Sequence, residues 1–139
     1  MSRASRRRGD AAKRHADTVR FVLFEPRPVG LEFRQLVRAS DLSPSQVRSG
    51  LAALKDQAAE KGWTPLTWTR QAGYQLGAER AVLEAYERAV VREKLTEFRR
   101  LIYGTVAPHA AAHPGDKWVK HIVAQLNSIE STLDLINSS

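Results

Sequence analysis

The sequence predicts a mainly α-helical chain with one small β-hairpin. Apolar residues recur every three or four positions over most of the 139 residues, as they do on the buried face of a helix. Residues 64–69 (TPLTWT) are instead rich in Thr and Trp, which favour strands, and Gly73 permits a turn into a second strand. Two long segments with helical periodicity follow this hairpin and predict two long C-terminal helices.

Two helices are expected before the middle of the chain. The first spans about residues 10–24, ends at Glu25-Pro26, and buries Val19, Val22 and Leu23. The second is short and amphipathic, with Leu31, Phe33, Leu36 and Val37 on its apolar side. Residues 40–42 then form a turn of three residues, which is the usual length between the helices of a helix-turn-helix.

The next helix has the best-defined boundaries. Ser43 is a preferred N-cap, Pro44 occupies the first helical position, and Gln46 stands at the third, where it can complete a capping box. Gly62 ends the helix as a glycine at the C′ position does. An apolar stripe of Val47, Leu51, Leu54 and Ala58 is expected to face the core.

The other face of this helix carries side chains that can bind DNA bases or phosphates. Its first three turns contain almost no acid, which suits a polyanionic partner. The candidate DNA-binding residues of this helix are Ser43, Ser45, Gln46, Arg48, Ser49 and Lys55. We expect Gln46 or Arg48 to contact a base edge.

Residues 17–77 resemble the winged-helix DNA-binding domains of bacterial regulators. LSPSQVRSGLAALKDQAAEKGW is similar to the recognition helix of MarR-like proteins, and TWTRQAGYQLG resembles the strand–turn–strand that closes response-regulator output domains. The resemblance implies a winged helix-turn-helix followed by two long C-terminal helices. It also implies that the helix beginning at Ser43 enters the major groove, while the wing, with Arg70 and Gln71 at its tip, reaches the backbone or minor groove. Because a receiver domain is absent, no phosphorylation switch is expected.

The positive charge of the chain lies in its first half. The formal net charge is +7 and the sequence pI about 10.2, in the range of nucleic-acid-binding domains. Residues 1–77 hold 14 Lys and Arg against 7 Asp and Glu, whereas residues 78–139 hold 8 of each. Residues 1–10 are interpreted as a flexible basic arm, and the basic residues expected to follow the phosphates are Arg3, Arg6, Arg7, Arg8, Lys13 and Arg14. The alternative is a solvated tail that only aids solubility.

Residues 78–139 are interpreted as a two-helix dimerisation region that follows the DNA-binding domain of residues 11–77. One helix is expected over residues 79–103, ended by Gly104, and another over residues 116–136. The second carries a heptad seam of Val119, Ile122, Leu126, Ile129, Leu133 and Ile136. We favour burial of this seam against a second copy of the chain, and the alternative is an intramolecular helical hairpin.

Residues that would support catalysis or metal binding are scarce. The absence of cysteine excludes disulfides and thiol chemistry. His109 and His113 stand four apart, but no glutamate lies between them and Pro114 disfavours helical geometry at His113, so we expect a solvent-exposed linker there. The three tryptophans, Trp63, Trp68 and Trp118, are interpreted as core or interface aromatics. No enzyme activity, cofactor or metal is predicted.

These patterns together predict a sequence-specific protein that binds double-stranded DNA. A dimeric transcriptional regulator is the favoured function, in a soluble, cytoplasmic and nucleoid-associated protein. The alternative is a plasmid or phage partition or replication accessory protein whose C-terminal helices mediate assembly. A third hypothesis, an RNA-binding or enzyme-associated module that uses the winged fold without reading duplex DNA, is disfavoured because the sequence lacks aromatic RNA-stacking motifs.

Overall fold

The computed structural model describes the backbone of residues 3–139 and the side chains from Gly9 onward. It is mainly helical with one two-stranded antiparallel hairpin, as the sequence predicts. The chain forms two compact units, unit 1 (Met1–Leu83) and unit 2 (Glu84–Ser139). None of the helices in the described part is long and apolar enough to span a lipid bilayer.

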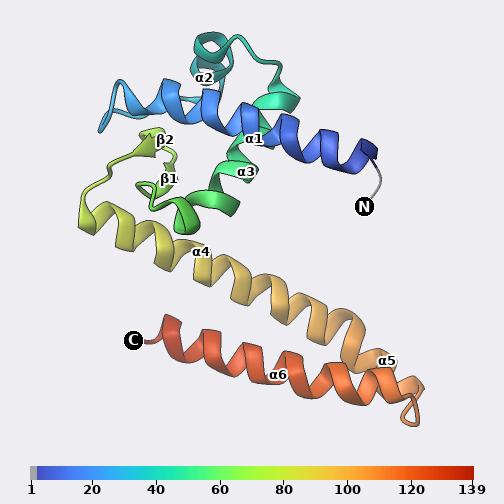
Figure 1. Ribbon diagram of the computed structural model, residues 1–139. Coiled ribbons are helices and arrows are strands. Elements are labelled where there is room, and N and C mark those ends of the chain that lie inside the picture. Colours follow the sequence, from blue (N-terminus) through green and yellow to red (C-terminus); the bar gives the residue numbers. More distant parts are fainter. Residues whose placement is uncertain (1–2) are drawn as a thin grey trace. The chain divides into compact units, whose positions relative to one another are not determined.

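Unit 1 contains three helices and the hairpin. They are α1 (Arg3–Phe24), α2 (Phe33–Ser40), α3 (Pro44–Lys61), β1 (Leu66–Thr69) and β2 (Gly73–Leu76), shown from blue to green in Figure 1. Helix α1 begins at Arg3, earlier than the Asp10 that was expected. The side chains of Arg3, Arg6, Arg7 and Arg8, the proposed basic arm, lie outside the described residues.

Leu31 does not belong to α2, contrary to expectation. Glu32 is the N-cap of α2 and forms a capping box with Gln35, so the helix begins after Glu32. The Leu31 amide donates to the Tyr74 carbonyl, and the Tyr74 amide donates back to the Leu31 carbonyl, each at 2.8 Å. Leu31 therefore adds one β-bridge to the edge of β2.

The predicted boundaries of α3 are confirmed. Ser43 is the N-cap in extended conformation, and its hydroxyl accepts from the Gln46 amide at 3.2 Å. The Gln46 side chain closes the capping box, and Pro44 occupies the first turn. Gly62 adopts the left-handed conformation, with φ of 61°, and its amide bonds back to the last turn.

One core holds unit 1 together. Its buried members come from all three helices and the hairpin: Ala16, Val19, Leu23, Leu36, Val47, Leu51, Leu54, Leu66 and Leu76. Val22 is partly buried against this core. Gly50 lies where α3 crosses α1, and a β-carbon there would stand 2.8 Å from the His15 carbonyl oxygen. The hairpin register places Leu66 opposite Leu76, so both leucines turn into the core.

Unit 2 is a helical hairpin whose first arm is longer than expected. Its elements are α4 (Arg80–Leu101), which begins before the unit boundary, η1 (Ile102–Val106), α5 (Ala107–Ala112) and α6 (Lys117–Asn137). Gly104 does not end the first helix, because the chain widens into the π-turn η1 and continues through the alanine-rich α5. The Ala107 amide bonds to the Ile102 carbonyl, so the turn accommodates Pro108, which lacks an amide hydrogen. His113 is not helical, as Pro114 predicts, with φ of −134°.

The two arms of unit 2 meet mainly near the connecting end. Ile102, Val106 and Leu126 form the buried cluster, with Phe98, Ile122 and Val123 packed on it. Farther along, polar side chains bridge the arms: Arg99 contacts Asp134 at 3.1 Å, and the Tyr103 hydroxyl donates to Glu130. Figure 1 shows α4 and α6 running in opposite directions, in yellow and red.

Candidate nucleic-acid interface

The capping box of α3 uses hydrogen-bonding groups of two side chains that were expected to contact DNA. The Ser43 hydroxyl accepts a hydrogen bond from the backbone amide of Gln46, and Gln46 Oε1 accepts one from the backbone amide of Ser43 at 2.9 Å. Gln46 therefore keeps only its Nε2 group as a free donor. A two-point contact with adenine needs both the oxygen and the nitrogen of the side-chain amide, and the cap already uses one of the two lone pairs of that oxygen.

The outward face of α3 is polar and small. Ser45 and Ser49 are exposed and lie on the side opposite the buried Val47 and Leu51. Ala52, one turn further, is also exposed. Arg48 and Lys55 are exposed on the flank of this face, and Asp56 adds one acid in a later turn. The first three turns therefore present hydroxyls, a methyl group and cations.

The hairpin tip is fixed by two backbone features. The Ala72 amide donates to the Thr69 hydroxyl at 3.0 Å, which tightens the turn. Gly73 has φ of 74°, and a β-carbon there would overlap the Leu31 carbonyl, so only glycine fits. Arg70 and Gln71, both exposed, stand on this turn.

Helix α1 contributes exposed basic side chains as well. Lys13 and Arg14 are exposed on this helix. Arg20 and Arg27 have a different role, because their guanidinium groups stack on the Phe24 ring at 5.2 and 3.4 Å. Arg20 also lies 4.8 Å from the Trp63 ring and so links the end of α1 to the end of α3.

Two arginines at this interface were not identified from the sequence. Arg34 and Arg38 lie four residues apart on the exposed side of α2. Together with Arg48 they line a groove whose apolar part comes from Phe33, Val37 and Pro44. Their spacing of four residues, which places two cations on one side of an amphipathic helix, is the sequence pattern that could have identified them.

The tryptophans differ in their surroundings. Trp63 is partly buried against the core of unit 1, in agreement with the expectation. Trp68 is 48% exposed and Trp118 59% exposed, so neither is a core residue, and for these two only the interface alternative stays a prediction. The fully buried members of both cores are aliphatic, and neither Trp68 nor Trp118 belongs to either cluster.

The histidines do not assemble a metal site. His109 lies in α5 rather than in a linker, and its Nε2 stands 3.5 Å from Asp116 Oδ2. His113 packs edge-on against His109, with ring centroids 5.5 Å apart. Among the described residues, no group of three or more His, Cys, Asp or Glu side chains could hold a metal ion.

The heptad seam of α6 is divided between the inside and the outside of unit 2. Val119 and Leu126 are buried within the chain, which agrees with the alternative of an intramolecular hairpin for these two positions. Ile122 and Leu133 are half-buried, whereas Ile129 and Ile136 are 39% and 50% exposed. The seam therefore has an outer side that unit 2 leaves uncovered.

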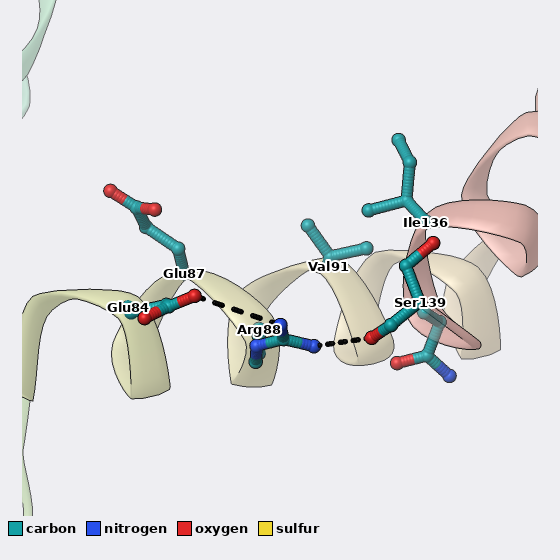
Figure 2. A pocket seen from close by; sticks show the side chains of 7 residues that line it. Glu84, Glu87, Arg88, Val91, Ile136 and Ser139 are labelled. Carbon is teal, nitrogen blue, oxygen red and sulfur yellow. Dashed lines mark hydrogen bonds and ion pairs between the residues drawn. The ribbon is translucent and has the colours of Figure 1, made fainter. Parts of the chain in front are cut away.

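Unit 2 is open at the end away from η1. An opening of about 330 Å³ is lined by Val91 of α4 and Ile136 of α6, together with Glu84, Glu87, Arg88, Asn137 and Ser139. Figure 2 shows Arg88 between Glu84 and the Ser139 carbonyl, which it contacts at 3.6 and 3.0 Å. The apolar side chains of Val91 and Ile136 stand beside this polar bridge.

No protein-family model, curated protein or solved structure matches the chain.

Proposed function

We propose that unit 1 is a winged helix-turn-helix domain that binds double-stranded DNA, with α3 in the major groove and the hairpin tip on the backbone or minor groove. The order of elements supports this proposal. Helix α1 is followed by the bridge residue Leu31, then by α2, α3 and the hairpin, and Leu31 pairs with β2 as a short third strand. A three-residue turn joins α2 to α3.

The observation that carries the proposal is the exposed face of α3. The capping box fixes the start of this helix, and Ser45, Ser49 and Ala52 point away from the core. Serine hydroxyls donate to or accept from base edges, and an alanine methyl contacts the thymine methyl. A helix of about 10–12 Å diameter fits the major groove, which is about 12 Å wide.

The charge distribution supports a polyanionic partner. The whole formal excess of +7 belongs to residues 1–77, and the exposed Lys13, Arg14, Arg48 and Arg70 are among its sources. Phosphate contacts of this kind supply most non-specific affinity and make binding salt-dependent. The basic residues before Gly9 are part of the same proposal.

We also propose that the protein acts as a homodimer through unit 2. Helical residues advance by about 100° each, so Trp118, Ile129 and Ile136 lie within about 20° of one another on α6. All three are exposed, and we call them the α6 apolar strip. A second copy that covers this strip would remove apolar surface from water, which favours association.

Sequencing of the DNA that the purified protein selects from random fragments tests the DNA-binding function. We expect one enriched motif, whose base preferences change in Ser45→Ala and Ser49→Ala but not in Ser128→Ala, an exposed serine of α6. A single palindrome would support a dimeric regulator, and an array of direct repeats in genomic fragments would support partition or replication. Absence of any duplex binding at low salt would refute the proposal.

Light scattering at tens of micromolar tests the dimer. We expect a dimer for the wild type and a monomer for Ile129→Lys, because a charge in the apolar interface costs several kcal/mol. Leu135→Lys is the matched control, since Leu135 is 71% exposed on α6 but about 100° or more away from the strip. Leu126 is unsuitable for this test, because it is buried within unit 2. A monomeric wild type would refute the dimer alone.

A further inference from the structure

A groove at the start of α2 and α3 combines an apolar floor with three cationic side chains. Its lining consists of Phe33, Arg34, Val37, Arg38, Pro44 and Arg48, and its volume is about 350 Å³. The three arginines are exposed, whereas Phe33 and Val37 are half-buried. Among the residues whose side chains the structure describes, no acidic one lines the groove.

The arrangement concentrates positive charge where folding alone does not require it. Leu36 and Ser40 turn into the core, so Arg34 and Arg38 share the exposed flank of α2. Like charges at this spacing repel each other by a few tenths of a kcal/mol. In the part of the chain whose side chains are described, none of these three guanidinium groups forms an ion pair. The acids nearest in sequence, Glu32 and Asp41, stand at the two ends of α2.

Arg48 is directed toward α2 and away from the outward face of α3. Its guanidinium lies 5.0 Å from the centre of the Phe33 ring. Stacking uses the face of the guanidinium and leaves its N–H edges free to bind an anion. The stack also restricts the side chain before binding, which lowers the entropy lost when a ligand is bound.

We propose that this groove binds the phosphate–deoxyribose backbone of one DNA strand, beside the major groove that α3 enters. Arg34, Arg38 and Arg48 bind phosphate oxygens, and the apolar floor contacts deoxyribose carbons. The inference rests on the proposed function of unit 1. It changes the role expected of Arg48 from a base contact to a phosphate contact, so that base preference comes from the serine face of α3.

The test measures duplex affinity over a series of salt concentrations for Arg34→Gln, Arg38→Gln and Arg48→Gln. Each lost phosphate contact should lower the slope of log K against log salt by about 0.9. Affinity should fall roughly tenfold, as for one charge-assisted hydrogen bond, and equally on the selected and a scrambled duplex. Arg92→Gln, an exposed arginine of α4, is the matched control and should change neither quantity.

Arg48→Lys separates charge from geometry. It should keep the salt slope but weaken binding, because lysine retains the charge and loses the planar stack on Phe33. Circular dichroism of each variant establishes that the fold is intact. Unchanged salt slopes in all three glutamine variants would overturn the proposal. The groove would then bind a different partner, such as an acidic peptide. If Arg48→Gln changes the base preference but leaves the salt slope unchanged, the phosphate contact of Arg48 is refuted, whereas the DNA-binding function of unit 1 is not. A wild type that binds no duplex would overturn both.

Discussion

Replacing Gly50 by alanine tests how closely α1 and α3 pack. The alanine β-carbon would stand 2.8 Å from the His15 carbonyl oxygen, 2.9 Å from its carbon and 3.1 Å from Val19 Cγ2. Two of these three atoms belong to the backbone of α1, so side-chain rotation cannot relieve the overlap. The helices must move apart, and the core that contains Val19 and Leu51 must repack.

Two opposing terms set the size of the effect. Overpacking a well-filled core costs about 1–3 kcal/mol. Alanine in place of glycine within a helix returns about 0.5–1 kcal/mol, because the unfolded chain loses less freedom on folding. We therefore expect Gly50→Ala to lower the free energy of unfolding by about 1 kcal/mol. Gly50→Val should lower it further, since valine adds two methyl groups and forms helix less readily.

Urea unfolding followed by tryptophan fluorescence measures this effect. A Trp118→Phe background leaves Trp63 and Trp68, which both belong to unit 1, as the reporters. Gly9→Ala is the matched control, because Gly9 is helical and a β-carbon there meets nothing within 4 Å. The control should be neutral or stabilising. If Gly50→Ala stabilises the protein as much as Gly9→Ala does, α1 and α3 do not pack as closely at Gly50 as the structure shows.

Three further substitutions test the local features on which the interface depends. Ser43→Ala should lower the free energy of unfolding by about 1 kcal/mol in the same urea experiment, because the backbone amide of Gln46 loses its acceptor. Ser45→Ala, at an exposed position with no capping bond, should leave the free energy of unfolding nearly unchanged. Gly73→Ala should lower the melting temperature more than Gly62→Ala does. Both glycines have positive φ, but only at Gly73 does the added carbon meet the Leu31 backbone. Equal effects of the two substitutions would contradict the bridge between Leu31 and Tyr74. Leu126→Ala should destabilise unit 2 by about 2–5 kcal/mol in circular dichroism melts, because it leaves a cavity beside Ile102 and Val106. Ile129→Ala should destabilise unit 2 less, because Ile129 is exposed. The reverse order would mean that Ile129 is buried.

Local chemistry let the sequence predict α3 and the hairpin. The start of α3 depends on Ser43, Pro44 and Gln46, and its end on Gly62. All of these act on backbone groups within a few positions of themselves, so the signal is complete in the sequence. The hairpin was predicted for the same reason, from strand-favouring residues and a glycine at the turn. The ion pair between Glu84 and Arg88, one helical turn apart at 3.6 Å, is a local contact of the same kind.

Gly104 shows where a local signal misleads. A glycine after a periodic helix predicts a stop, yet the helix passes through η1 and α5. The buried cluster of Ile102, Val106 and Leu126 packs residues on both sides of Gly104 against α6. Packing against a distant helix outweighs the helix propensity of one residue, which is worth about 1 kcal/mol.

The sequence by itself determined α3 with its two caps, the hairpin, the place of the positive charge and the residues on each face of α3. Tertiary structure alone decided which partners those faces meet. It turned Arg48 onto Phe33, brought Arg34 and Arg38 beside it, and divided the heptad seam of α6 into a buried side and an exposed side. The physical reason is that helical periodicity fixes the direction of a side chain relative to its own helix, whereas burial depends on residues far away in the chain.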